Sequence, residues 1–180
     1  MKIRLVRHGE TDGNARGLML GTKVDWPLNE KGIAQAENLK LDSGFDFIFS
    51  SPLKRTLQTA EILSKTLGAK LIVHQGLIER DKGILEGKTQ AEVAELTNGE
   101  VSEAVLYRKL VYDFSPYGGD SIETVEKRIK SFVADLLQNY SDKRVLVVTH
   151  LGIIRVMFLM YAGGPSALEG NGAINILDVH

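Results

Sequence analysis

Short runs of β-branched and other apolar residues alternate along the chain with longer segments in which apolar residues recur at helical spacing. The short runs predict strands at residues 3–6, 45–49, 71–73, 145–149 and 174–179. The longer segments predict helices at residues 30–41, 53–67, 89–96, 103–110, 121–139 and 151–161. Apolar strands that alternate with helices are typical of a parallel sheet with both faces covered. We therefore expect a three-layer α/β fold: a mainly parallel β-sheet flanked by helices on both faces.

One of these helices has a recognisable start. Ser51 and Pro52 stand directly before the segment 53–67, in which Leu57, Ala60 and Leu63 lie on one face. Serine is a favoured N-cap residue, and proline is favoured at the first helical position. We therefore expect Ser51 to cap this helix and to leave unpaired backbone N–H groups near the end of the preceding strand.

Length and composition describe a single globular domain and exclude several classes of protein. The chain has 180 residues, and its 22 basic and 23 acidic residues give a formal net charge of −1. No surplus of positive charge is available to bind a nucleic-acid backbone or an anionic membrane. The chain has no cysteine, which excludes disulfides, thiol nucleophiles and iron–sulfur clusters. No apolar run approaches the ~20 residues of a membrane span, and no signal peptide is visible, so we expect a cytoplasmic protein.

Chemically active side chains follow the carboxyl ends of the predicted strands. Arg7 and His8 come after the first strand, and Arg55 lies about one helical turn after the second. Glu79 follows the third strand within a few residues, and His150 follows the fourth directly. Ligands of open parallel sheets bind beyond this edge. Each residue taken singly has an ordinary structural explanation, but their joint placement favours a functional site.

The chemistry of this set suits the transfer of a phosphoryl group. A neutral imidazole is a good nucleophile near pH 7 and can attack phosphorus, and a second imidazole can donate a hydrogen bond to a phosphoryl oxygen. Two guanidinium groups match the geometry of a phosphate dianion. A carboxylic acid can protonate the leaving oxygen. The set supplies charge and positioning without a metal ion. The remaining histidines, His74 and His180, are interpreted as structural or incidental.

Several sequence blocks resemble those of one enzyme family in the same order. They are LVRHGET followed by Asn14, DWPLNEKGIAQA at 25–36, SSPLKRTLQTA at 50–60, LIERDKGILEG at 77–87, GGDS at 118–121 and VVTHLGIIR at 147–155. Together they resemble the histidine phosphatase superfamily, in its phosphoglycerate mutase-like branch, which includes small broad-specificity and α-ribazole-phosphate-type phosphatases. The resemblance covers nearly the whole chain and implies the same mainly parallel, three-layer fold.

The resemblance also implies roles for individual residues. His8 matches the phosphorylated nucleophile, and Glu79 matches the acid/base carboxylate. Arg7, Arg55 and His150 match residues of the phosphate pocket. Of these, His150 is expected to be a third catalytic residue beside His8 and Glu79. The resemblance adds one residue to this pocket, because Asn14 matches an asparagine that binds phosphate in the family. It further implies that the enzyme uses no metal ion and no cofactor.

The chain departs from the family pattern around the mouth of the pocket. Leu20 stands where a glutamine is common, and one extra residue separates Gly21 from Asp25. Leu151 replaces a glycine directly after the second histidine, and a leucine replaces the tryptophan of the block at 77–87. Residues 83–89 look like a nucleotide-binding P-loop but do not match its pattern, because three residues separate the two glycines where the motif requires four. These departures leave the substrate open.

Three functions are weighed. The leading hypothesis is a metal-independent phosphomonoesterase that hydrolyses small phosphate esters through a phosphohistidine. The alternative is a phosphoglycerate mutase-type enzyme that transfers the phosphoryl group between hydroxyls, and the third is a non-enzymatic phosphate-recognition module. We expect residues 1–180 to form one domain in which 88–120 are a cap-like insertion over the pocket. The expected partner is a small phosphomonoester, and the sequence leaves a homodimer open.

Overall fold

A five-stranded sheet runs through the middle of the molecule. The computed structural model describes residues 1–101, 112–164 and 170–180. The strands are β1 (Lys2–Arg7), β2 (Phe47–Ser50), β3 (Lys70–Val73), β4 (Val145–Thr149) and β5 (Ile174–Asp178), in the spatial order β3-β2-β4-β1-β5. The first four run parallel, and β5 pairs antiparallel with β1 at one edge. The predicted mainly parallel sheet is confirmed, and the carboxyl ends of its four parallel strands meet at one side.

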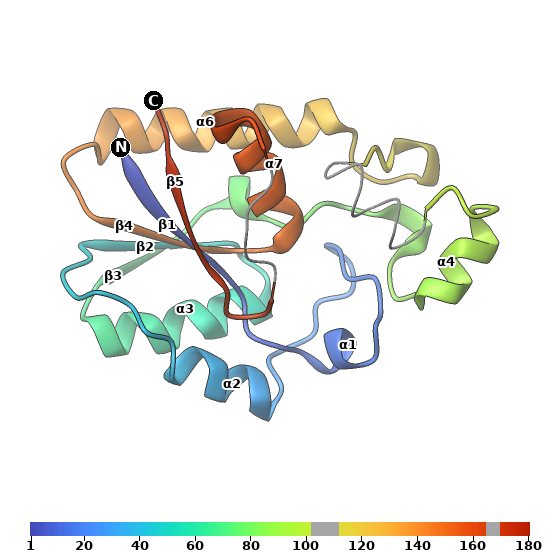
Figure 1. Ribbon diagram of the computed structural model, residues 1–180, viewed down its shortest axis with the longest axis horizontal. Helices are drawn as coiled ribbons and strands as arrows, with labels where there is room; N and C mark the ends of the chain where they lie inside the picture. Colours follow the sequence, from blue (N-terminus) through green and yellow to red (C-terminus); the bar gives the residue numbers. More distant parts are fainter. Residues whose placement is uncertain (102–111, 165–169) are drawn as a thin grey trace.

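Helices cover both faces of the sheet, as the sequence predicts. Helices α2 (Glu30–Glu37) and α3 (Lys54–Leu67) lie on one face, and α6 (Ile122–Asn139) and α7 (Leu151–Ala162) lie on the other (Figure 1). Successive residues of β4 point to opposite faces of the sheet. Val145 and Val147 pack in the core between the sheet and helices α6 and α7, and Leu146 and Val148 pack in the core between the sheet and α3. A strand with both faces buried is continuously apolar for this reason.

The helix ends differ from the sequence prediction at two points. Helix α2 ends at Glu37, where the side chain and the backbone N–H of Asn38 both donate to the carbonyl of Ala34. The N-cap of α3 is Leu53, which makes no side-chain cap bond, so the prediction that Ser51 caps this helix is wrong. The Ser51 hydroxyl instead lies 2.8 Å from Nε2 of His150. A contact between two segments that are distant in the sequence but follow neighbouring strands of the sheet therefore uses the side chain that the local sequence assigns to the helix.

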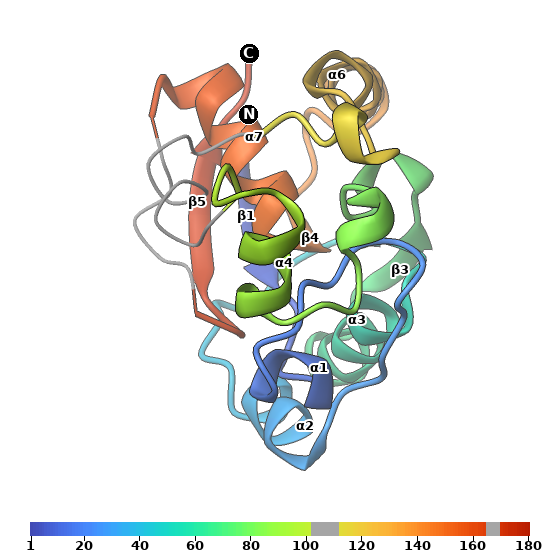
Figure 2. The same cartoon turned by 90° about the vertical axis from the view of Figure 1, so that its right-hand side faces the viewer.

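Short elements gather beyond the carboxyl ends of the parallel strands. They are α1 (Asp12–Ala15), α4 (Gln90–Leu96) and the 3₁₀ turns η1 (Gln75–Leu77), η2 (Gly83–Leu85) and η3 (Ser115–Tyr117). Figure 2 shows α1 and α4 in front of the sheet in the view toward this side. A small apolar cluster that includes Met19, Leu85, Val93 and Phe114 holds this region together.

Part of the expected cap falls outside the described residues. The helix predicted at 103–110 lies there, together with the apolar and basic side chains of residues 102–111. Within the parts of the chain that the structure describes, no helix has the length and apolar character needed to cross a membrane.

Candidate active site

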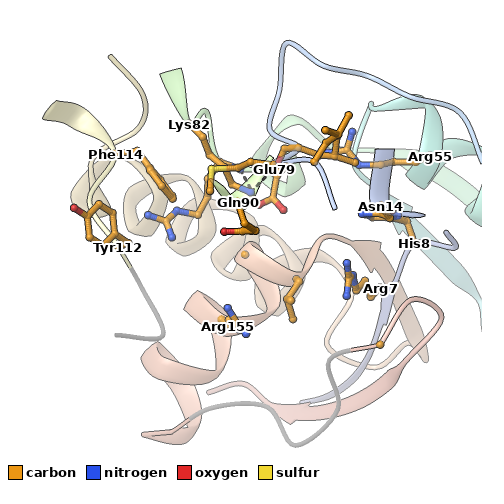
Figure 3. A pocket seen from close by; sticks show the side chains of 17 residues that line it. Arg7, His8, Asn14, Arg55, Glu79, Lys82, Gln90, Tyr112, Phe114 and Arg155 are labelled. Atoms are coloured by element: carbon orange, nitrogen blue, oxygen red, sulfur yellow. Dashed lines mark hydrogen bonds between the residues drawn. The ribbon is translucent and has the colours of Figure 1, made fainter. Parts of the chain in front are cut away.

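A cavity of about 500 Å³ opens beyond the carboxyl ends of β1 and β4 (Figure 3). Among the described residues, its lining contains five cationic side chains and a single carboxylate, Glu79. The cationic residues are Arg7, Arg55, Arg80, Lys82 and Arg155. His8, Asn14 and Gln90 add polar groups to the wall. Such an excess of positive charge in a protein whose net charge is −1 favours an anionic ligand.

His8 stands where β1 ends, and the sheet holds its backbone. Its N–H donates to the carbonyl of Thr149 at 3.0 Å, which extends the β1–β4 ladder by one residue. Its ring Nδ1 lies 2.7 Å from the carbonyl oxygen of Gly9. Because a carbonyl oxygen can only accept, Nδ1 carries the proton and Nε2 of the neutral ring keeps its lone pair. The structure thus leaves Nε2 as the nucleophilic atom of this side chain.

The surroundings of His8 keep its ring neutral. The residue is only 3% exposed, and burial lowers the pKa of the imidazole well below its ordinary value of 6.5. The positive charges of Arg55 and Arg7 lower that pKa further. An imidazolium would lose its hydration and face two guanidinium groups, so the uncharged form is favoured. His8 is therefore an uncharged base in a positively charged pocket at neutral pH.

His150 lies against His8 but does not line the cavity. The two ring centroids are 5.2 Å apart, and His150 is fully buried. Nε of Arg55 donates to its Nδ1 at 3.3 Å, which places the proton on Nε2, where Ser51 Oγ lies 2.8 Å away. Burial, Arg55 and His8 lower the pKa of His150 well below its ordinary value. Both of its ring nitrogens are thus bound to protein groups, and one of them orients Arg55.

Arg55 is a fully buried cation at the start of α3. Its Nη2 donates to the carbonyl of Gly21 at 2.9 Å, and its Nη1 lies 3.6 Å from Oδ1 of Asp25. Nη1 is buried and has no hydrogen-bond partner among the described residues. Burial lowers the pKa of this guanidinium, while the carboxylates of Glu79 and Asp25 oppose that shift. A buried guanidinium N–H without a partner is costly, and a bound phosphate oxygen would satisfy it.

Asn14 reaches the pocket from the first helical turn after β1. Its backbone N–H donates to Oγ1 of Thr11, and its Oδ1 accepts from the backbone N–H and the hydroxyl of Thr11 at 3.2 and 2.9 Å. The side chain of Asn171 also donates to this oxygen at 3.4 Å. These contacts engage the carbonyl side of the amide. Nδ2 is therefore the atom of Asn14 that can donate to an anion in the cavity.

Glu79 is held at the pocket wall by its neighbours. Its Oε1 accepts the backbone N–H of Arg80 at 2.9 Å, and Nη2 of Arg128 donates to its backbone carbonyl at 3.2 Å. The side chain is 6% exposed. A Cβ on Gly152 would lie 2.4 Å from Oε1, so only glycine at this position of α7 leaves room for the carboxyl group. Tertiary packing therefore sets where this acid can act.

The rim loop that departs from the family pattern is organised by one carboxylate. Glu86 accepts backbone N–H groups from three successive residues of the loop and from Lys82 at distances of 2.7–3.1 Å; the three are Thr22, Lys23 and Val24. This arrangement places the Gly21 carbonyl against Arg55. Leu20 and Leu151, two of the departures noted in the sequence, both line the cavity and each adds an apolar side chain to its wall.

Five of the six site residues expected from the sequence line one cavity, and His150 lies behind it. The expected residues in the lining are Arg7, His8, Asn14, Arg55 and Glu79. Sequence reasoning missed Arg80, Lys82, Gln90 and Arg155, which are cavity residues as well. Nothing in their spacing marks them, although Arg80 follows Glu79 directly. Among the described residues, no group of three or more His, Cys, Asp or Glu side chains is placed to hold a metal ion.

The burial of His8 and His150 predicts that the folded protein loses stability in mild acid. Their folded-state pKa values lie below the value of about 6.5 expected in the unfolded chain, so the unfolded state takes up protons first as the pH falls. Each of these histidines then lowers the free energy of unfolding by up to ~1.4 kcal/mol for every pH unit below 6.5. We expect the free energy of unfolding, measured with urea, to fall by about 2 kcal/mol from pH 7.5 to 5.5. His150→Gln should roughly halve this pH effect, and an equal free energy at both pH values would contradict the account.

The chain is similar to known proteins over almost its whole length. A family model described as the histidine phosphatase superfamily (branch 1) matches residues 3–179. A metal-independent phosphoserine phosphatase from Arabidopsis thaliana is 32% identical over 98% of this chain and 75% of its own length. Probable phosphoglycerate mutase GpmB from Proteus mirabilis is 33% identical over 94% of this chain and 78% of its own. The solved structure of Bacillus stearothermophilus YhfR matches with a TM-score of 0.82 at 26% identity, covering 99% of this chain and 91% of that one.

Proposed function

The chain belongs to the histidine phosphatase superfamily (branch 1), and from this premise we propose that it hydrolyses small phosphate monoesters through a phosphohistidine on His8. One observation carries the proposal. Nδ1 of His8 is bound to the Gly9 carbonyl, and burial beside Arg7 and Arg55 keeps the ring neutral. Nε2 therefore offers a lone pair to a ligand that the surrounding positive charge attracts.

In the first step, the cavity binds the phosphoryl group of the ester. Arg7, the unpartnered Nη1 of Arg55 and Nδ2 of Asn14 hold its oxygens. Nε2 of His8 attacks phosphorus, the N–P bond forms and the P–O bond to the alcohol breaks. The carboxylic acid of Glu79 gives its proton to the departing oxygen, which leaves as the neutral alcohol. The products of this step are the alcohol, phosphohistidine and the carboxylate of Glu79.

In the second step, water replaces the alcohol. The carboxylate of Glu79 accepts a proton from the attacking water, the new P–O bond forms, and the N–P bond breaks. Inorganic phosphate leaves, and His8 and Glu79 return to their first protonation states. His150 supports both steps by holding Arg55 through its Nδ1. Donation from His150 itself to a phosphoryl oxygen stays a prediction, because both of its ring nitrogens are engaged, Nδ1 with Nε of Arg55 and Nε2 with Oγ of Ser51.

Two further parts of the proposal concern conditions and place. Metal independence is supported by the cationic side chains of the cavity, which supply the charge that a Mg²⁺ or Zn²⁺ ion would otherwise bring. The Arabidopsis relative is named as a metal-independent enzyme. A cytoplasmic location is supported by the complete absence of cysteine, which suits a reducing compartment.

A mutase is the second candidate, because the 33% identical relative from Proteus mirabilis is named a probable phosphoglycerate mutase. The two reactions share the first step and differ in the acceptor of the phosphoryl group. A mutase must exclude water from its phosphoenzyme and must hold a second hydroxyl near His8. The distinction therefore depends on the product formed and has to be measured.

The test is a product analysis carried out in excess EDTA. We expect the protein to release phosphate from p-nitrophenyl phosphate and from alkyl phosphates under these conditions, and vanadate to inhibit it. Incubation with 3-phosphoglycerate and a trace of 2,3-bisphosphoglycerate separates the candidates, since a phosphatase yields free phosphate and a mutase yields 2-phosphoglycerate. Activity that is lost in EDTA and restored by one metal ion would contradict metal independence. Binding of phosphate without turnover of any ester would favour the third hypothesis, a non-enzymatic phosphate-recognition module.

A further inference from the structure

The segment that leads into β5 is bound to the end of β1. The backbone N–H of Arg7 donates to the carbonyl of Ala173 at 3.1 Å, and the N–H of Gly172 donates to the carbonyls of Arg7 and His8 at 3.1 and 3.3 Å. These bonds continue the antiparallel β1–β5 ladder beyond the ends of the two strands. The backbone turns at Gly172, whose φ of +74° lies in the left-handed region that favours glycine. The residue directly before this glycine is thereby placed beside His8.

That residue is Asn171, and its amide makes three contacts around His8. Nδ2 of Asn171 donates to the carbonyl of His8 at 3.1 Å and to the carbonyl of Gly9 at 3.3 Å. It also donates to Oδ1 of Asn14 at 3.4 Å. The three partners are all acceptors, since two are backbone carbonyls and the third accepts the backbone N–H of Thr11. The NH₂ group of Asn171 fits among these oxygens, and its own carbonyl oxygen would be repelled by them.

The contact with the Gly9 carbonyl bears directly on the nucleophile. This oxygen lies 2.7 Å from Nδ1 of His8, and its two lone pairs let it accept from Nδ1 and from Asn171 together. Two further contacts restrain the backbone of Gly9. Its N–H donates to Oγ1 of Thr59 at 3.1 Å, and a side chain on Gly9 would collide with the carbonyl oxygen of Gly32. Asn171 therefore helps to fix the acceptor that keeps the proton on Nδ1 and leaves the Nε2 lone pair free.

The contact with Asn14 bears on the binding of the phosphoryl group. Thr11 and Asn171 together engage Oδ1 of Asn14, so the amide is held with Nδ2 available to the cavity. Asn171 itself is not among the described residues that line the cavity. One side chain outside the lining thus supports both the ring that attacks phosphorus and an amide that binds a phosphoryl oxygen.

We propose that Asn171 is a positioning residue of the phosphoryl-transfer reaction, which fixes the tautomer and direction of the His8 ring through the Gly9 carbonyl and the orientation of Asn14 directly. This inference rests on the proposed function, and it concerns a residue outside the sequence blocks that resemble the family. The attacking nitrogen has to stand about 3–3.5 Å from phosphorus and in line with the bond that breaks. A hydrogen bond that sets the direction of the ring therefore affects the rate without touching the substrate.

Two substitutions of similar size test this role in the hydrolysis of p-nitrophenyl phosphate. Asn171→Leu removes the donor, and Asn171→Asp replaces it with an oxygen that faces three other oxygens. We expect kcat to fall about 10–100-fold in Asn171→Leu and further in Asn171→Asp, as suits a misplaced reacting group. The fall in kcat should exceed the rise in KM, because the reacting atom is displaced. A kcat within about twofold of wild type in both variants would overturn the proposal, and so would a change in KM larger than the change in kcat.

The matched control is Asn38→Leu. Nδ2 of Asn38 also donates to a backbone carbonyl, that of Ala34 at 2.8 Å, at the end of α2. This control should keep the wild-type kcat and KM. Urea unfolding of each variant measures the folded fraction under assay conditions. A loss of kcat no greater than the loss of folded protein would overturn the proposal, because Asn171 would then only stabilise the fold.

An NMR measurement keeps this inference separable from the proposed function, because it needs no substrate. Long-range ¹H–¹⁵N spectra distinguish the two neutral tautomers of histidine, and the His8 signals are those that disappear in His8→Ala. The wild-type protein and Asn38→Leu should show the Nδ1–H tautomer, and both Asn171 variants should show a mixture. A mixture confined to these variants would support the proposal even if no ester were hydrolysed. An unchanged His8 tautomer in both would overturn it even if phosphatase activity were present.

Discussion

Replacing His8 by alanine is expected to abolish turnover of every phosphate ester while the protein remains folded. The variant loses the atom that forms the N–P bond, and removal of a nucleophile typically costs ~10⁴–10⁶ in kcat. The fold should tolerate the change, because His8 is held mainly through its backbone bond to Thr149. The measurements are the rate of phosphate release and the circular dichroism spectrum. His180→Ala is the matched control, since it removes an exposed histidine at the end of the chain and should keep full activity.

Trapping the intermediate gives the same prediction a second readout. Wild-type protein quenched during turnover of ³²P-labelled ester should carry label that is labile in acid and stable in alkali, as expected of phosphate bound to nitrogen. The His8→Ala protein should carry none. Label on the variant, or turnover above a few per cent of wild type, would mean that another residue accepts the phosphoryl group.

Replacing Glu79 by glutamine is expected to slow different substrates by different factors. Glutamine keeps the size of the side chain and can still accept the Arg80 backbone N–H, but it has no acidic proton. An alkoxide needs a proton to leave, and general acid catalysis is typically worth ~10²–10⁴-fold. Hydrolysis of alkyl phosphates should therefore slow by about that factor. p-Nitrophenolate leaves readily as an anion, so hydrolysis of its ester should slow about tenfold or less.

The ratio of the two rates decides the role of Glu79. Glu61→Gln, an exposed substitution on α3, is the control and should change neither rate. If Glu79→Gln slowed both substrates by the same factor, the carboxylate would only order the cationic groups around it. Assignment of Glu79 as the general acid would then have to be withdrawn.

Local physics explains why so much of the architecture could be predicted. Apolar side chains in β4 are continuous because both faces of that strand are buried, and such a run identifies a central strand without any knowledge of its neighbours. The parallel direction of four strands then brings their carboxyl ends together, which is why His8, Glu79 and Arg55 could be grouped before their distances were known. The error at Ser51 has the opposite origin, since its hydroxyl contacts His150, ninety-nine residues away.

The amino-acid sequence by itself determined the layers of the fold, the edge of the sheet at which the chemistry gathers and the types of side chain that stand there. These properties follow from periodicity and from residue identity, which act over short stretches of chain. Only the tertiary structure decided the protonation of the His8 ring, because the burial and the two arginines that set it come from different elements. It likewise decided that Arg80, which looks like any charged residue in a loop, is a buried cation beside Phe114 whose Nε and Nη2 have no hydrogen-bond partner among the described residues. Burial and charge at a point depend on everything packed around it, and no local pattern records them.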